Sequence, residues 1–175
     1  LFKTFAVEKY PIDEQRIGIL GMTPQDVSDL DATDKIRDLF QQKYGQKAVC
    51  YCMGDGLQEV KKSSSVSRNI VVSPAALATA KYLEKTFGTP YEIYYPLVED
   101  LIPEMDYTGK RILVVHQQVI ADSIRKELLK RAGLPLQQIV PLSVSQSVTC
   151  TTAAVQTQCV ADSAEPGKPE PAVPQ

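Results

Sequence analysis

The stretch that decides the fold is NIVVSPAALATAKYLEKTFGTPY, residues 69–91. The apolar run NIVV stops at Ser73-Pro74, and Pro74 suits the first position of a helix, where its missing N–H costs nothing. The residues that follow repeat at the i, i+4, i+7, i+11 spacing of a buried helical stripe: Ala76, Ala80, Leu83 and Phe87. Gly88-Thr89-Pro90 ends the helix before the apolar run YEIYY. The stretch therefore predicts a strand, a helix and a second strand.

The rest of the chain repeats this alternation. Apolar runs predict strands at 16–21, 47–53, 69–72, 91–95, 110–116 and 136–142. Helical patterns follow at 31–44, 57–64, 74–87 and 119–132, with Asp31 and Thr33 as caps of the first helix and Gly45 and Gly133 as helix ends. Strands alternating with helices of this length indicate parallel βαβ units. We expect an α/β fold of Rossmann-like parallel sheets with flanking helices, one complete unit plus part of a second.

The pattern also divides the chain. Residues 1–14 predict an extended lead-in, 15–96 a Rossmann-like domain and 97–109 a connector with at most one helical turn, because Pro103 interrupts it. Residues 110–142 predict a partial second Rossmann-like domain. Residues 143–175 are polar and rich in Pro toward their end, which indicates an irregular, disordered tail.

Composition excludes several classes of function. A formal net charge of −2 gives no electrostatic case for binding nucleic acid or an anionic membrane. No apolar stretch reaches the roughly 20 residues of a transmembrane helix, and the start has no signal-peptide pattern, so we expect a cytoplasmic protein. Cys50, Cys52, Cys150 and Cys159 form neither CxxC nor Cys/His pairs. We interpret the first two as buried strand cysteines in a reducing compartment and expect no metal site.

Motifs for common reactions are missing as well. The sequence contains no G-x-x-x-x-G-K-[ST], and Gly18 and Gly21 do not complete G-x-G-x-x-G. No G-x-S-x-G marks a nucleophilic serine. The residues alone thus predict a ligand-binding α/β scaffold without specifying a reaction.

Candidate binding residues follow from the topology. Right-handed crossovers place every strand-to-helix loop at one edge of the sheet, where open α/β folds bind ligands. We expect the loops 21–31, 53–57, 72–76 and 116–119 to line one cavity. The candidate cavity-lining residues are Met22, Thr23, Asp55, Ser73, His116 and Gln117.

Several of these residues have a structural alternative. Ser73 is first of all the N-cap of its helix, whose N-terminus would also favour an anion. Asp55 has the position of a helix cap, with Gln58 completing a capping box. His116, the single histidine, ends a strand and has the alternative of a hydrogen-bonded structural residue.

The order of motifs resembles the component 1 proteins of nitrogenase and nitrogenase-like oxidoreductases. The resemblance covers residues 16–140. It rests on a first strand ending in Gly, the segment GDGLQEVKKSSSVSRNIVV, the helix AKYLEKTFGTPY and the restart GKRILVV. It implies a metallocluster oxidoreductase subunit whose Rossmann-like domains surround an iron–sulfur or related cluster. It also implies two partners, an ATP-dependent iron protein that supplies electrons and a homologous component 1 subunit.

The resemblance also shows departures. Ser73 occupies the position of the cysteine that binds the cofactor in molybdenum nitrogenase, and an alkoxide is a poor substitute for a thiolate at iron. Gln117-Gln118-Val119 replaces a glycine-rich, arginine-containing loop beside the cofactor. We therefore expect a relative that reduces another substrate, or a cofactor-assembly scaffold.

We expect the chain to be a fragment of a longer protein, with no bound cluster and no activity in isolation. A non-catalytic α/β module that binds anions or small molecules is the alternative from another class.

Overall fold

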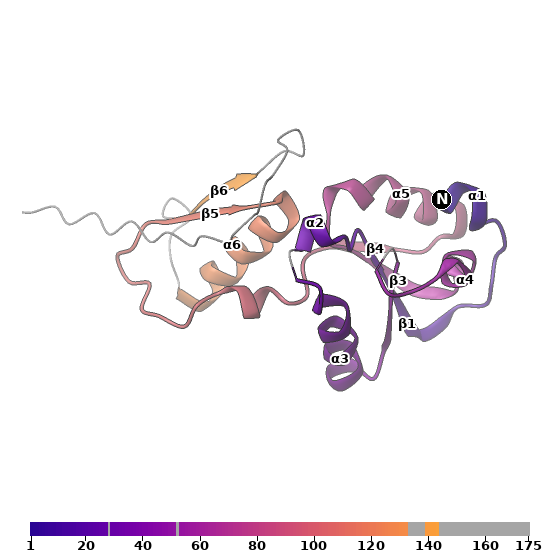
Figure 1. Ribbon diagram of the computed structural model, residues 1–175, viewed down its shortest axis with the longest axis horizontal. Coiled ribbons are helices and arrows are strands. Elements are labelled where there is room, and N and C mark those ends of the chain that lie inside the picture. Colours follow the sequence, from indigo (N-terminus) through magenta and orange to yellow (C-terminus); the bar gives the residue numbers. More distant parts are fainter. Residues whose placement is uncertain (28, 52, 133–138, 144–175) are drawn as a thin grey trace, which may run out of the picture.

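The computed structural model describes residues 1–27, 29–51, 53–132 and 139–143. Its larger sheet contains β1 (Asp13–Leu20), β2 (Lys47–Cys50), β3 (Val66–Val71) and β4 (Tyr91–Ile93) in the order β2-β1-β3-β4. Every neighbouring pair is parallel. The smaller sheet pairs β5 (Ile112–His116) with β6 (Ile139–Ser143), again in parallel. The expected α/β fold of Rossmann-like parallel sheets is confirmed, and Figure 1 shows the two units side by side.

The helices lie between the strands, as the alternation predicts. They are α2 (Pro24–Val27), α3 (Ala32–Tyr44), α4 (Leu57–Lys61), α5 (Leu77–Phe87) and α6 (Gln118–Ala132). Gly45 and Gly88 end α3 and α5 in the left-handed conformation, at φ of 62° and 78°, which a residue without Cβ adopts readily. Three 3-10 turns, Ser63–Ser65, Pro74–Ala76 and Val98–Leu101, complete the set. Val98–Leu101 is the single turn expected in the connector, whereas Gly133 lies outside the described residues.

The N-terminal segment differs from the extended lead-in that we expected. Phe2–Phe5 forms a short helix, α1, and β1 begins at Asp13. Phe2 is buried and its ring meets that of Tyr51 edge-on, with 5.3 Å between the ring centroids. One helical turn is too short to show a 3.6-residue period, and the first residues of β1 are polar and exposed. The sequence pattern could therefore reveal neither feature.

Each face of the larger sheet carries its own apolar core. Ile17 and Ile19 point to the face covered by α3, through Ile36 and Phe40. Leu20, on the opposite face, belongs to a second core with residues of α1, α4 and α5. Figure 1 shows this layering, with α1 and α5 on one side of the sheet and α3 on the other. Burial of both faces is typical of parallel sheets.

The core on the α3 side continues into the second unit. Tyr95, Leu97 and Ile102 of the connecting segment belong to the same cluster as Ile112 and Ile120 of that unit. Ser123 of α6 adds a buried polar link, since its Oγ accepts a hydrogen bond from the Tyr95 N–H at 2.9 Å. The two units are therefore packed through one continuous core. Within the described residues, the longest apolar helical stretch falls short of what a membrane-spanning helix requires.

Candidate functional site

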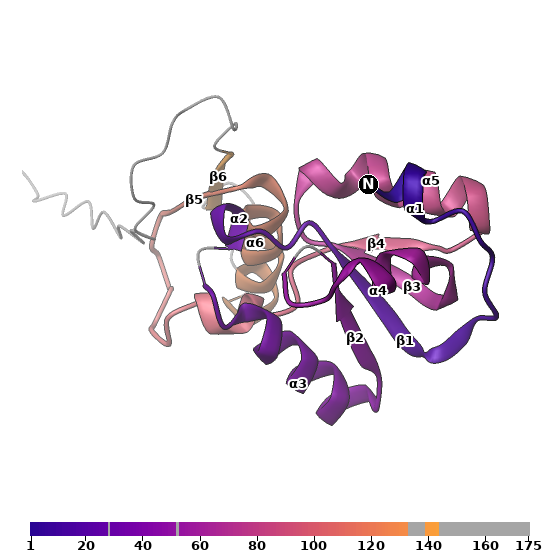
Figure 2. The ribbon, with the colours of Figure 1, turned by 45° about the vertical axis from the view of Figure 1, so that its right-hand side comes forward.

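Three loops meet where the parallel strands end. A Cβ added to Gly21, which follows β1, would lie 2.9 Å from the Ser73 Cβ and 3.0 Å from the Ala76 Cβ. After β5, the Gln117 side chain donates from Nε2 to the Val72 carbonyl oxygen at 2.6 Å. Figures 1 and 2 show α2, which follows the first loop, next to α6. We call Thr23, Asp26, Ser73, His116 and Gln117 the carboxyl-edge site.

Ser73 is a helix cap, as the sequence predicts. Its backbone is extended, and its Oγ accepts a hydrogen bond from the Ala75 N–H at 3.3 Å. The first turn is 3-10 over Pro74–Ala76, and α5 begins at Leu77. The side chain is fully buried beneath the loop that follows β1. The hydroxyl therefore stabilises the start of the helix from within the protein.

His116 ends β5 with one ring nitrogen already in use. Its Nδ1 accepts a hydrogen bond from the Gln117 N–H at 2.8 Å. Accepting at Nδ1 requires this nitrogen to be unprotonated, so the neutral ring carries its proton on Nε2. Burial lowers the pKa of His116 below 6.5, while the nearby Asp26 carboxylate acts in the opposite direction. A neutral imidazole with an Nε2–H donor therefore stands at the edge at pH 7.

Thr23 and Asp26 form a local pair at the start of α2. The Thr23 hydroxyl donates to Asp26 Oδ2 at 2.8 Å, and the Asp26 N–H donates to Thr23 Oγ1 at 3.2 Å. Asp26 is buried and acts electrostatically on His116. We did not predict Asp26, although TPQD, residues 23–26, is a capping-box pattern that could have marked it.

Gln117 ties two loops together. Besides the bond from Nε2 to Val72, its Oε1 accepts a hydrogen bond from the Val119 N–H at 2.8 Å. The side chain thus caps the first turn of α6 and holds that turn against the end of β3. A glycine at this position could do neither.

Two predicted residues lie apart from this site. Met22 is fully buried and belongs to the apolar core on the α3 side, so it does not line a cavity. Met22 was predicted to line a cavity, and in the structure its side chain packs in the core.

Asp55 does not cap a helix, so that prediction and the capping box with Gln58 are wrong. Gly56 holds the N-cap position of α4 without a side-chain hydrogen bond. Asp55 Oδ2 instead accepts from the Cys50 N–H at 2.7 Å and from Arg37 Nη2 at 3.0 Å. The turn brings Asp55 back beside Tyr51 in an isolated bridge, which directs the carboxylate toward β2 and α3. Asp31 holds the N-cap position of α3, also without a side-chain bond, and Thr33 lies inside the first turn.

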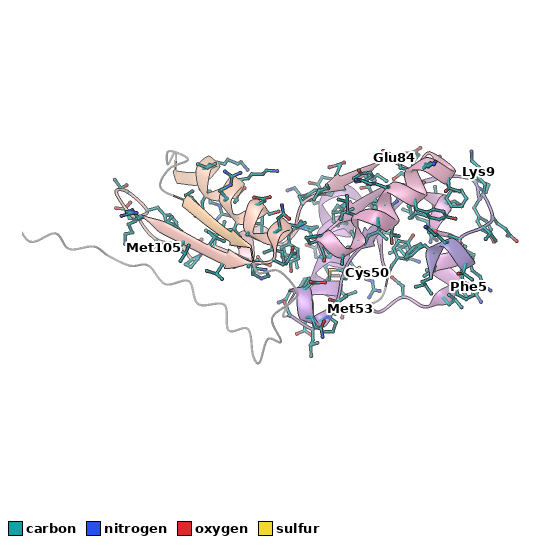
Figure 3. The ribbon with its side chains drawn as sticks, turned by 90° about the horizontal axis from the view of Figure 1, so that it is seen from above. Phe5, Lys9, Cys50, Met53, Glu84 and Met105 are labelled. Atoms are coloured by element: carbon teal, nitrogen blue, oxygen red, sulfur yellow. The ribbon has the colours of Figure 1, made fainter. Side chains whose placement is uncertain are left out.

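The donor set does not suit a metal cluster. In the part of the chain that the structure describes, no three His, Cys, Asp or Glu side chains gather as a metal would need. Cys50 is buried, and burial raises its thiol pKa to about 12, which keeps it protonated at neutral pH. Figure 3 places Cys50 beside Met53, near the junction of the two units. Cys52, Cys150 and Cys159 lie outside the described residues.

A shallow hollow of about 430 Å³ lies elsewhere, on the connector. It is lined by Pro103 to Thr108 and by Arg131. In Figure 3, Met105 of this lining lies at the end of the second unit farthest from Cys50 and Met53. The hollow is therefore separate from the carboxyl-edge site.

Comparisons with protein-family models, with curated proteins and with solved structures found no match to the chain.

Proposed function

We propose that the chain is part of a component 1-type subunit of a nitrogenase-like oxidoreductase, which receives electrons from an ATP-dependent iron protein and pairs with a homologous subunit. The proposal starts from the order of the GDG, SPAALA and GKRILVV segments along residues 16–140. The observation that carries it is the contact between the loops that follow β1, β3 and β5, since Gly21 touches Ser73 and Gln117 bonds to Val72. In the family these loops face the cofactor.

The described residues supply a wall for such a cofactor and do not fit as its ligands. Ser73 stands where the family has a thiolate, but its hydroxyl is buried and caps a helix. Cys50 is buried and protonated. The proposal therefore assigns cluster ligation to parts of the full-length protein outside these residues. What His116 offers is a neutral Nε2–H donor at the edge of the wall.

Iron content tests this proposal directly. The full-length protein, produced and purified without oxygen, is expected to contain iron and to absorb in the visible range. Ser73→Ala is expected to keep the same iron content, because Ser73 is not a ligand. A colourless, iron-free protein that is otherwise folded would overturn the proposal. Loss of iron in a folded Ser73→Ala protein would instead make Ser73 a ligand.

Partner binding separates the enzyme from its rivals. The proposed function predicts capture of an ATP-dependent iron protein by the full-length protein, followed by substrate reduction with MgATP. Iron and capture without turnover would indicate a cofactor-assembly scaffold. Thermal stabilisation by phosphate or by a carboxylate metabolite, with no iron bound, would indicate a small-molecule-binding module.

A further inference from the structure

A buried polar group crosses the face of the larger sheet opposite α3. Gly18 of β1 pairs with Asn69 of β3 on one side and with Val49 of β2 on the other. A Cβ on Gly18 would lie 2.2 Å from Asn69 Oδ1 and 2.8 Å from Tyr51 Cε2. The Asn69 amide and the Tyr51 ring therefore meet over the one position of the central strand that has no side chain.

Four side-chain atoms of this group have no hydrogen-bond partner among the described residues. Asn69 and Tyr51 are both fully buried. Asn69 Nδ2, Asn69 Oδ1, the Tyr51 hydroxyl and Arg16 Nε account for four of the seven buried side-chain atoms without a hydrogen bond in the described part of the chain. We call Arg16, Tyr51 and Asn69 the buried polar group. Three of these atoms belong to Asn69 and Tyr51, which meet over Gly18, so they call for a common explanation.

Arg16 acts electrostatically on Tyr51. Burial raises the pKa of Tyr51, and the positive charge of Arg16 opposes this effect. Arg16 lies two residues before Gly18 in β1, which directs both to one face of the sheet. Its Nη2 pairs with Glu59 of α4, whereas its Nε faces no acceptor among the described residues. Arg16 Nε is thus a further unpaired donor on the same face of the sheet as Asn69 and Tyr51.

The described part of the chain gives these atoms no partner. A phenol offers one donor and the amide presents two donors and an acceptor, so a direct Tyr51–Asn69 bond would leave most of the amide unpaired. Buried polar atoms in proteins nearly always have a partner, and ordered water supplies it where side chains do not. A buried water makes about three hydrogen bonds to such groups.

We propose that the buried polar group is an internal water-binding site. Bound water accepts hydrogen bonds from Asn69 Nδ2 and from the Tyr51 O–H, and donates one to Asn69 Oδ1. Phe2 of α1 meets the Tyr51 ring edge-on and Glu59 holds the Arg16 guanidinium, so α1 and α4 close the site. The water fixes β3 against β1 four residues before Ser73, and so helps to position the carboxyl-edge site.

Magnetisation transfer from water in NMR tests the site on the unmodified 175-residue chain. The Asn69 side-chain amide protons are expected to show cross-relaxation with a long-lived water. Asn69 amide protons that show none, together with slow exchange of these protons, would mean a dry site and overturn the proposal.

Tyr51→Phe gives an independent test, because a wet and a dry site predict changes in stability of opposite direction. Removal of a hydroxyl that binds water is expected to raise the unfolding equilibrium constant about three- to tenfold. In a dry site the same change removes an unpaired buried hydroxyl, and stability would stay the same or rise. Tyr44→Phe is the matched control because the Tyr44 side chain is about half exposed, at 53%, and no change is expected. Should Tyr51→Phe fail to fold, the water measurement decides alone.

Discussion

Ser73 is the residue at which local sequence and structure agree best. Its side chain bonds to the backbone only two residues ahead, and Pro74 fixes the start of the turn. The capping bond and the position of Pro74 both depend on neighbouring residues in the sequence. They can therefore be predicted without knowing the tertiary contacts of Ser73. Ser73 is thus a side chain that stabilises the fold.

Ser73→Ala is expected to destabilise the protein by about 1 kcal/mol, because the Ala75 N–H loses its cap inside the protein. Urea denaturation would measure the change. Thr86→Ala in the exposed part of α5 is the control and is expected to stay within about 0.5 kcal/mol of the parent. Equal stability of Ser73→Ala and the parent would contradict the capping role.

His116 is expected to make stability depend on pH. Its pKa in the folded state lies below the ordinary 6.5, mainly because of burial. The unfolded chain therefore binds a proton more readily, so the contribution of His116 is present above about pH 6.5 and is lost as the pH falls through the folded-state pKa. NMR titration of the ring, with urea denaturation at about pH 7.5 and 5.5, would measure both effects.

His116→Gln should flatten this pH dependence above the range where carboxylates titrate, because the chain has no other histidine. A ring pKa above 6.5 in the folded protein would contradict the prediction. It would mean that the Asp26 carboxylate outweighs burial.

Other residues could not be assigned from sequence, and the reasons are physical. Asp55 occupies a capping position, but whether it caps depends on the direction of the turn, and Cys50 and Arg37 draw its carboxylate away. Met22 follows a glycine turn, and only the packed structure shows that it faces the core. For each residue the deciding partner lies on another element.

At the scale of elements, periodicity predicted those with a long apolar stripe. The helices α3, α5 and α6 and the parallel direction of the strands were predicted, whereas α1 and the polar first half of β1 were not. The sequence predicted that the loop after β1 and the start of α5 lie at the same edge of the sheet, but it did not predict their close contact. Its distance depends on Gly21, which has φ of 91° and almost no free space around its Cα.

Gly21→Ala tests this contact between elements. A side chain at φ of 91° is strained, and its Cβ would overlap Ser73 and Ala76, so we expect a loss of about 2–4 kcal/mol. Gly45→Ala is the matched control, since Gly45 is also left-handed but has nothing within 4 Å of the added Cβ. It should lose only about 1–2 kcal/mol from the backbone strain. Equal losses in thermal or urea denaturation would show that the loops are not in tight contact.

At the scale of the molecule, the alternation of strands and helices predicted one parallel Rossmann-like unit plus part of a second. It did not predict the strand order β2-β1-β3-β4 or the continuous core, because both depend on contacts between distant segments. The meeting of Tyr51 and Asn69 over Gly18 belongs to the same class, since it requires three strands in register. The sequence pattern therefore predicts the helix or strand that a segment forms, whereas contacts between distant segments are known only from the structure.

Ser123 tests whether the two units behave as one. Its Oγ accepts from the Tyr95 N–H at 2.9 Å and donates to the Val119 carbonyl at 2.7 Å, so it links the segment after β4 to α6. Ser123→Ala leaves the Tyr95 N–H buried without this partner, at an expected cost of about 1–3 kcal/mol. Lys126→Ala, exposed on the same helix, is the control and should change stability by less than about 0.5 kcal/mol.

Hydrogen exchange would show which strands and helices are destabilised by Ser123→Ala. Because the core runs from Ile17 through Tyr95 to Ile120 without interruption, destabilisation at the junction should speed exchange in β1 as well as in β5. Faster exchange confined to α6 and β5 would contradict a single cooperative unit. It would mean that the second unit opens independently of the first, and that the loop after β5 can leave the Ser73 loop while the larger sheet stays folded.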